Sequence, residues 1–424
     1  MAPSPATTSG RRAELDSIRV LVVVGLVFFH TALVFDAQDD FYVKNAETTP
    51  FTLVVSALGV LWAMPLLFFL AGLGAWHSLR RRGAGEYVAE RLRRLGVPLV
   101  FGTVVLVPLP QWLRQRADPA FHESYPEFLP RFFTLDGFKW RDFPFVFDGR
   151  YFEFGHLWFL LLLLTFSLIL APLVRWGGAP GRRPGDREPW GRRLGDRAAA
   201  LAERRPGAIL LPAVPLAVVC ALAGLEEQFA GWHRAAYLLF FLFGFAFAGD
   251  ERFRAALRRD LRLITVCGVV IFLVGAPLLM TAGGDPFTDL APQATAGRAL
   301  FGVTGWCWLV AILGFLDRRG RSAATRSAAT RPERRPRRWY AYLSEAVLPL
   351  YVLHQPIVVA VASVVIGWEA PIAVKFPVIS VVSLVLIFAV YDLLVRRTDP
   401  ARFLFGMRPR PRPPAEVRTG SSPP

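Results

Sequence analysis

The sequence has few of the residues that crosslink a chain or hold a metal ion. Among its 424 residues there are only three cysteines and six histidines. The cysteines, Cys220, Cys267 and Cys307, all lie in apolar runs, and an odd number there argues against a disulfide framework. No P-loop, dinucleotide-binding fingerprint, metal-ligand cluster or Ser-His-Asp order occurs in the sequence. We therefore expect no metal and no permanently bound cofactor.

Charge is also scarce, and long apolar runs take its place. Charged residues make up 19% of the chain and hydrophobic residues 54%, with a mean hydropathy of +0.39. Several runs approach the roughly 20 residues that cross a hydrocarbon core as a helix. The composition predicts an all-α, polytopic integral membrane protein with about ten transmembrane helices. These are expected at about 18–36, 52–78, 97–113, 155–175, 207–225, 234–250, 263–282, 298–316, 345–366 and 374–395.

The basic residues are distributed unevenly over the predicted loops. If the N-terminus is cytoplasmic, 39 of the 49 Lys and Arg residues fall in inner segments and seven in outer loops. This positive-inside pattern predicts that both termini are cytoplasmic and that the protein spans the cell membrane. Topology and attraction to anionic lipid heads thus explain the net charge of +16, and nucleic-acid binding is not expected. No cleavage site of small residues follows the first apolar run, so we expect an uncleaved anchor.

Composition also sets the expected domain boundaries. Residues 1–396 are expected to form one membrane domain, and residues 397–424 a disordered, Arg/Pro-rich cytoplasmic tail. The outer loop 114–154 differs, because it mixes many aromatic side chains with Asp, Glu and Arg. That mixture suits a carbohydrate or an amphipathic small molecule, but it is also typical of an aromatic belt at the membrane interface.

The first span carries ionisable residues at its inner mouth and deep inside. Arg19 and His30 are eleven residues apart, which is close to three helical turns. They therefore share a face, about 16 Å apart along the axis, and Asp16 joins that face three residues before Arg19. An ionisable group within a span is costly and is a functional candidate by default. The alternative for His30 is a neutral imidazole that is hydrogen-bonded to a neighbouring helix.

Two other segments hold polar side chains that packing alone does not require. The inner segment "EYVAERLRRLGVP" (86–98) contains Arg91 and Arg94, whose i, i+3 spacing would place both guanidinium groups on one face to bind phosphate. Arginine at an inner helix end is also what positive-inside topology demands. The ninth span, "YLSEAVLPLYVLHQP" (342–356), contains Tyr351, His354 and Gln355 together.

These motifs, in this order, resemble the membrane acyltransferase-3 family. The resemblance rests on "LDSIR" followed by His30, the R-x-x-R pair, "GHLWFL" (155–160) and the ninth span. The last two motifs are most similar to the glucan biosynthesis protein C branch. The resemblance implies ten spans, an essential His30, and Arg19, Arg91 and Arg94 as the residues that bind an acyl-CoA donor. Asp16 is expected to orient Arg19, and Trp158, Tyr351, His354 and Gln355 are expected to contact the substrate.

The resemblance further implies transfer of an acyl group from cytosolic acyl-CoA. Acetyl-CoA is the expected donor, with succinyl-CoA as an alternative, and the acceptor is a hydroxyl of a glycan or another outer or membrane-associated molecule. His30 would act as a general base or as the nucleophile itself. A transporter or flippase is the alternative, although the sequence contains no clear internal repeat of the kind such proteins share. A structural or sensory membrane protein is a third possibility.

Overall fold

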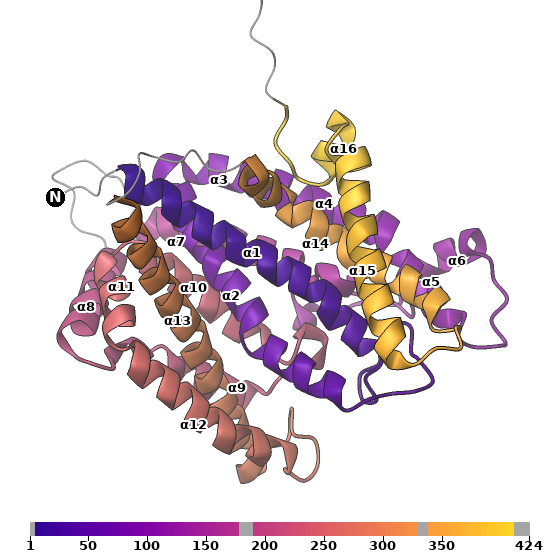
Figure 1. The fold of residues 1–424 in the computed structure, drawn as a ribbon, viewed down its shortest axis with the longest axis horizontal. Coiled ribbons are helices and arrows are strands. Elements are labelled where there is room, and N and C mark those ends of the chain that lie inside the picture. The colour runs from indigo at the N-terminus through magenta and orange to yellow at the C-terminus, as the bar shows by residue number, and fades with distance from the viewer. Residues whose placement is uncertain (1–4, 178–189, 329–337, 411–424) are drawn as a thin grey trace, which may run out of the picture.

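The apolar runs form long helices that lie side by side in the computed structural model (Figure 1). The structure describes the backbone of residues 5–177, 190–328 and 338–410. Side chains are described from Ser17 onward within these ranges, except at 51, 53–58, 175–177, 190–192, 320–328 and 338–340. The α-helices are α1 (Pro5–Leu33), α2 (Phe51–Arg81), α3 (Ala84–Arg91), α4 (Val97–Phe101), α5 (Pro108–Gln115), α6 (Tyr125–Phe132), α7 (Trp158–Gly177), α8 (Trp190–Arg204), α9 (Ala213–Ala223), α10 (Arg234–Phe247), α11 (Glu251–Arg259), α12 (Leu261–Met280), α13 (Pro292–Ala328), α14 (Arg338–Val365), α15 (Ile372–Val390) and α16 (Asp399–Leu404).

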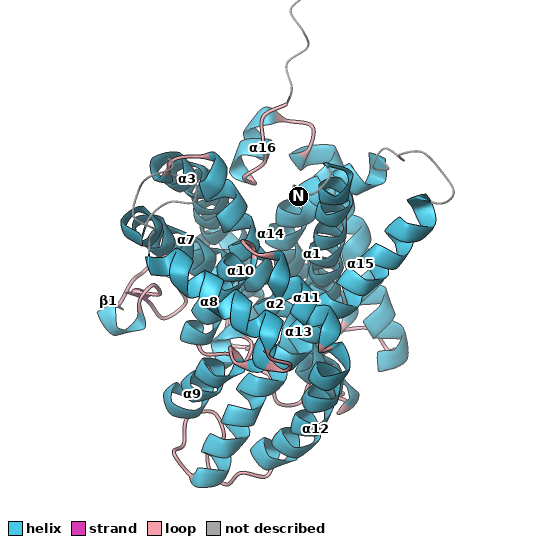
Figure 2. Cartoon of the chain, turned by 90° about the vertical axis from the view of Figure 1, so that its left-hand side faces the viewer, coloured by secondary structure: helices cyan, strands magenta, loops and turns pink. Residues whose placement is uncertain are grey.

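Shorter elements connect or interrupt these helices. The π-helical segments are η1 (Leu92–Gly96), η2 (Gly102–Leu106) and η7 (Tyr391–Val395). The 3-10 turns are η3 (Trp140–Asp142), η4 (Gly155–Leu157), η5 (Ala208–Leu210) and η6 (Glu227–Phe229). Strands β1 (Gly137–Phe138) and β2 (Phe147–Asp148) pair antiparallel, with Gly137 opposite Asp148 and Phe138 opposite Phe147. Figure 2 shows this strand pair at the edge of an otherwise helical molecule.

The all-α, multi-pass prediction is confirmed. Among the described residues, eight helices are long and apolar enough to cross a membrane. They are Gly59–Arg81, Ala84–Gln115, Gly155–Val174, Glu227–Phe247, Leu261–Met280, Pro292–Arg319, Ala341–Val365 and Ile372–Val395. Two shorter apolar helices, Ser17–Leu33 and Ala208–Ala223, lie at the first and fifth predicted spans.

Several helices turn apolar side chains away from the protein. Only 17% of the most apolar window of α12 is buried inside the molecule. Its outward side chains include Val266, Leu273 and Val274, each more than half exposed. A soluble protein rarely exposes a contiguous apolar face of this kind, whereas contact with lipid requires one.

The helices alternate between two ends of the bundle. In Figure 1, the N-terminal end of α1 lies with α8 and α11 along the left side, and α3 and α16 lie along the top. The segment with α5 and α6 lies at the right, and the connections after α1 and α12 lie along the bottom. The predicted inner segments and outer loops thus occupy opposite ends of one bundle.

Helix α1 lies between two groups of helices. It packs against α14 and α15 on one side and against α2 on the other. Helix α2 in turn packs closely against α10, and α13 against α9 and α12. A polar side chain on α1 can therefore meet residues from the beginning and the end of the chain.

The third span is longer than the predicted 97–113. It runs from Ala84 to Gln115 through α3, η1, α4, η2 and α5, and so carries Arg91 and Arg94 within the helix itself. Pro98 lies where η1 passes into α4, inside this helix, and cannot donate a backbone hydrogen bond to the preceding turn. The third span and the predicted inner loop are thus one continuous helical segment.

The expected boundary at residue 397 falls within folded chain. Helix α16 lies beyond it, and Phe405 and Met407 are buried against the membrane domain. Residues 411–424 lie outside the described residues.

Two glycines let α2 and α10 touch backbone to backbone. A Cβ atom on Gly72 would overlap the carbonyl oxygen of Phe241, and one on Gly244 would overlap that of Phe69. We expect Gly244→Ala to destabilise the protein by about 1–3 kcal/mol, the usual cost of overpacking. Thermal unfolding in detergent would show this as a lower midpoint. Gly25→Ala is the matched control, because no atom lies within 4 Å of its added Cβ. Equal midpoints for the two variants would contradict the prediction.

Candidate functional site

Three histidines from distant parts of the sequence meet within the bundle. His30 comes from α1, His156 from η4 at the start of α7, and His354 from α14. The ring centroids of His30 and His354 are 5.0 Å apart, as are those of His354 and His156. His156 and His354 are buried, and His30 is partly buried. We call these three residues the histidine cluster.

Helix α14 fixes the position of His156. The backbone N–H of His156 donates to Oε1 of Gln355 at 3.0 Å, and the Tyr351 hydroxyl donates to the His156 carbonyl. The His156 Nε2 atom lies 3.0 Å from the carbonyl oxygen of Val352. Because a carbonyl only accepts, Nε2 carries the proton in this contact. Tyr351 and Gln355 therefore hold the short turn that brings His156 to the cluster.

The other two histidines each bury a ring nitrogen that has no partner among the described residues. In His354 the Nδ1 atom contacts the Tyr351 carbonyl and so carries the proton, which leaves Nε2 as an unpaired acceptor. In His30 the unpaired atom is Nδ1. Leaving such atoms buried costs free energy, so they are suited to exchange a proton with a bound molecule. Within the part of the chain that the structure describes, no group of three or more His, Cys, Asp or Glu residues is placed to hold a metal ion.

Residues of the loops that are predicted to be outer also lie next to the histidine cluster. Phe41 stacks on the His30 ring with centroids 5.6 Å apart. The next residue, Tyr42, donates its hydroxyl to Glu153, and the Arg114 guanidinium lies 4.9 Å from the centre of the Tyr42 ring. Burial raises the pKa of the Glu153 carboxyl, and burial together with this carboxyl raises the pKa of Tyr42 well above its usual range. A group of buried and half-buried polar side chains thus adjoins the cluster.

Arg19 lies about three turns of α1 from His30, toward the opposite end of the bundle. Its Nη2 atom donates to the carbonyl oxygen of Leu70 on α2 at 3.0 Å. The predicted partner Asp16 is part of α1, but its side chain lies outside the described residues. The role of Asp16 stays a prediction.

Arg91 and Arg94 are held by different neighbours. The Arg91 guanidinium lies 4.9 Å from the centre of the buried Tyr87 ring, and its Nε atom is buried without a partner among the described residues. Arg94 belongs to η1 and faces Glu90 at 3.8 Å. Arg94 is also close enough to Arg91 and Arg19 for their charges to affect its own.

The remaining predicted residue, Trp158, lies two residues beyond His156. Its ring packs against Tyr237 and Phe229, with centroids 5.4 and 5.5 Å away. The structure thus brings together His30, Tyr351, His354 and Gln355, and sets Trp158 in the neighbouring aromatic core. Sequence reasoning did not select His156, although "GHLWFL" contains it.

The sequence was compared with known protein families, with curated proteins and with solved structures. A family model described as an acyltransferase domain matches residues 12–395. Neither the curated proteins nor the solved structures contain a significant match to the chain. Since the family match covers nearly the whole sequence, this multi-pass membrane protein belongs to the acyltransferase-3 family.

Proposed function

We propose that the protein is an O-acyltransferase that moves an acetyl or succinyl group from cytosolic acyl-CoA to a hydroxyl of an outer or membrane-associated acceptor. The observation that carries this proposal is the buried Nδ1 atom of His30, which has no partner among the described residues and lies on the same helix as Arg19. A donor with a polyanionic head and a reactive thioester at the end of a long arm fits such an arrangement. Arg19, Arg91 and Arg94 would bind the phosphates, and the arm would follow α1 toward His30.

The chemical step is a substitution at the thioester carbonyl carbon. The acceptor oxygen forms a bond to this carbon, and the bond from carbon to sulfur breaks. His30 takes the proton from the acceptor hydroxyl and returns it to the departing CoA thiolate. His354 adjoins His30, and its Nε2 atom supplies a second acceptor for a proton or for a hydroxyl hydrogen bond. An acyl-His30 intermediate would use the same atoms in two steps.

The acceptor would approach from the outer loops. Phe41 and Tyr42 provide ring surfaces beside the cluster, and Glu153 provides a carboxyl group. Rings beside carboxyl groups suit the alternating apolar faces and hydroxyls of a sugar. This arrangement, with "GHLWFL" and "VLHQP" in the sequence, supports a glycan acceptor and membership of the glucan biosynthesis protein C branch.

Release of free CoA from membranes tests the function directly. Membranes that contain the protein would receive acetyl-CoA or succinyl-CoA together with a glycan extract, and the free thiol and labelled glycan would be measured. We expect both products to appear together and only when the protein is present. Acceptor movement across the membrane without thiol release would instead favour a transporter.

The topology predicts which positions impermeant reagents reach. Position 117, in the outer loop, and position 198, in α8, are both exposed and lie at opposite ends of the bundle. We introduce Ala117→Cys or Ala198→Cys after replacing the three native cysteines. In cells without an outer barrier, an impermeant maleimide should label position 117 and leave position 198 unlabelled until the membrane is opened. The reverse pattern would place Arg91 and Arg94 outside, away from cytosolic acyl-CoA.

A further inference from the structure

The chain after α16 folds back over the segment that carries Arg94. Gly406 has a φ of +66°, and a Cβ atom there would overlap the Arg94 carbonyl oxygen and approach Cγ of Pro98 to 2.9 Å. The next residue, Met407, is buried, and the Phe405 ring lies 5.3 Å from Phe101 of α4. We call residues 405–410 the C-terminal strap. The strap thus lies in direct contact with η1 and α4.

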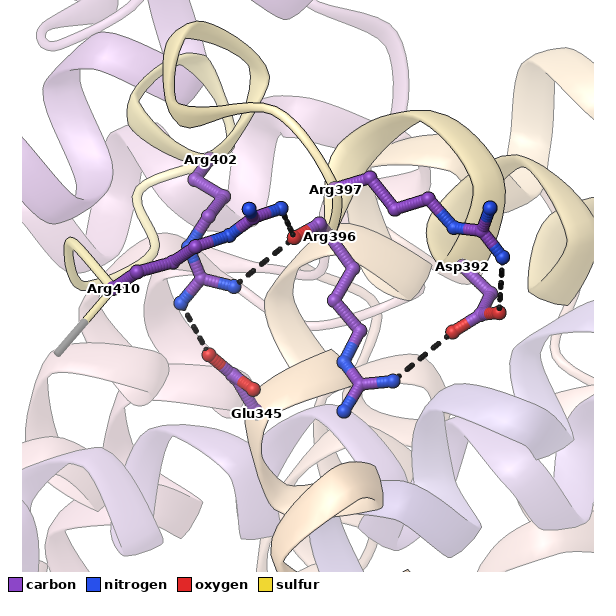
Figure 3. Close-up of a pocket in the computed structure, with 6 residues that line it drawn as sticks. All are labelled: Glu345, Asp392, Arg396, Arg397, Arg402 and Arg410. Atoms are coloured by element: carbon purple, nitrogen blue, oxygen red, sulfur yellow. Dashed lines mark hydrogen bonds and ion pairs between the residues drawn. The ribbon is translucent and has the colours of Figure 1, made fainter. Parts of the chain in front are cut away.

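Two arginines fasten the strap on both sides of Arg408. Arg402 is buried, pairs with Glu345 of α14 at 2.6 Å, and donates to the Arg408 carbonyl through Nε at 3.0 Å and Nη2 at 2.7 Å. Arg410 donates to the Arg396 carbonyl at 2.9 Å. Figure 3 shows the pair of Arg402 with Glu345 and the contact of Arg410 with the Arg396 carbonyl, around a pocket of about 400 Å³. The backbone of Arg408 is therefore held in place while its side chain remains exposed.

The Arg408 side chain faces the other basic residues of this end of the bundle. It lines a second pocket, of about 650 Å³, together with Arg82, Arg93 and Glu90. Arg94 interacts electrostatically with three guanidinium groups, those of Arg91, Arg408 and Arg19. The nearby carboxylate of Glu90 is shared between Arg82 and Arg94. Cations held this close repel one another, and a polyanion between them would relieve that repulsion.

We propose that Arg408 binds a phosphate of the acyl-CoA donor in the second pocket, which it lines with Arg82 and Arg93 beside η1, so that the C-terminal strap forms one wall of the donor site. This rests on the proposed function, because that function supplies the donor. Arg91 and Arg94 come from the third span, and Arg408 comes from the opposite end of the chain. The pairing of Arg402 with Glu345 gives the strap its fixed position, so Arg402 is a positioning residue.

Binding of CoA, which has the phosphates but no acyl group to transfer, tests the proposal. Calorimetry on the purified full-length protein should show CoA binding about tenfold weaker in Arg408→Ala, the loss expected for one charge-assisted contact. Arg408→Lys should recover part of the affinity, because it keeps the charge and loses the planar fork. Arg397→Ala is the matched control: it removes one exposed arginine from the first pocket and should leave CoA affinity unchanged.

The outcomes distinguish the proposed role of Arg408 from the proposal that acyl-CoA is the donor. Unchanged CoA affinity in Arg408→Ala, with a loss in Arg91→Ala, would overturn the role of Arg408 and leave the donor assignment standing. Unchanged affinity in both variants would overturn the donor itself. An equal loss in Arg408→Ala and Arg397→Ala would also overturn the proposal, because only general charge would then matter. The thermal midpoint of each variant, measured alongside, shows that the protein remains folded.

Discussion

Replacement of His30 by alanine should abolish acyl transfer and leave the protein folded. Loss of a general base or nucleophile costs roughly 100-fold or more in rate. The fold should survive because the buried Nδ1 atom of His30 has no partner among the described residues, so its removal leaves no buried group unpaired there. Initial rates of CoA thiol release from acetyl-CoA, at matched protein levels, measure the effect. His30→Gln should be equally inactive, since an amide is not a base.

A second histidine provides the control for this experiment. His122 lies exposed in the loop between α5 and α6, away from the histidine cluster, and His122→Ala should keep the wild-type rate. Wild-type turnover in His30→Ala would remove His30 from the chemistry and direct attention to His354, whose Nε2 atom is the other unpaired nitrogen. Substitution of His156 would be harder to interpret, because its ring contacts the Val352 carbonyl and its loss would also disturb α14.

The helices were predictable because apolar length is a local property of the sequence. Each predicted span has an apolar helical stretch at its place, although at the first and fifth spans the apolar stretch found among the described residues has fewer than 18 residues. The predicted start of the third span, at residue 97, was wrong, because a proline such as Pro98 is typical of the first turn of a helix. The chain instead continues from α3 through the π-helical η1, which a search for a period of 3.6 residues does not detect.

The site was predictable only where residues on one helix share a face. Arg19 and His30 follow from helical spacing, and Tyr351, His354 and Gln355 from their shared stretch of the ninth span. His156 could not be selected this way, because its partners Val352 and Gln355 are almost 200 residues away in sequence. The order of the C-terminal strap was not predicted for a related reason. Its Arg/Pro-rich composition resembles a disordered tail, and its order comes from the contacts of Arg402 with α14 and with its own backbone.

Replacing Arg91 or Arg94 by alanine should raise the KM for acyl-CoA about tenfold or more, with a smaller effect on the KM for the acceptor. A hydrogen bond between charged groups contributes about 1.5–3 kcal/mol, which corresponds to this change in affinity. Arg91 is prepared for such a contact, since its guanidinium group stacks on the Tyr87 ring and its Nε atom is buried without a partner among the described residues. Kinetics with each substrate varied in turn distinguish the two constants.

Two further variants, Arg91→Lys and Arg80→Ala, test whether the effect on the KM for acyl-CoA is specific to the guanidinium groups of Arg91 and Arg94. Arg91→Lys should recover only part of the donor affinity, because lysine has neither the planar fork nor the same stacking on Tyr87. Arg80 stacks on Trp76 at 4.6 Å near the same end of the bundle but does not line either pocket, so Arg80→Ala should leave both KM values unchanged. If only the acceptor KM rose in the Arg91 and Arg94 variants, these residues would bind the acceptor. The donor would then have to reach His30 along a path other than α1.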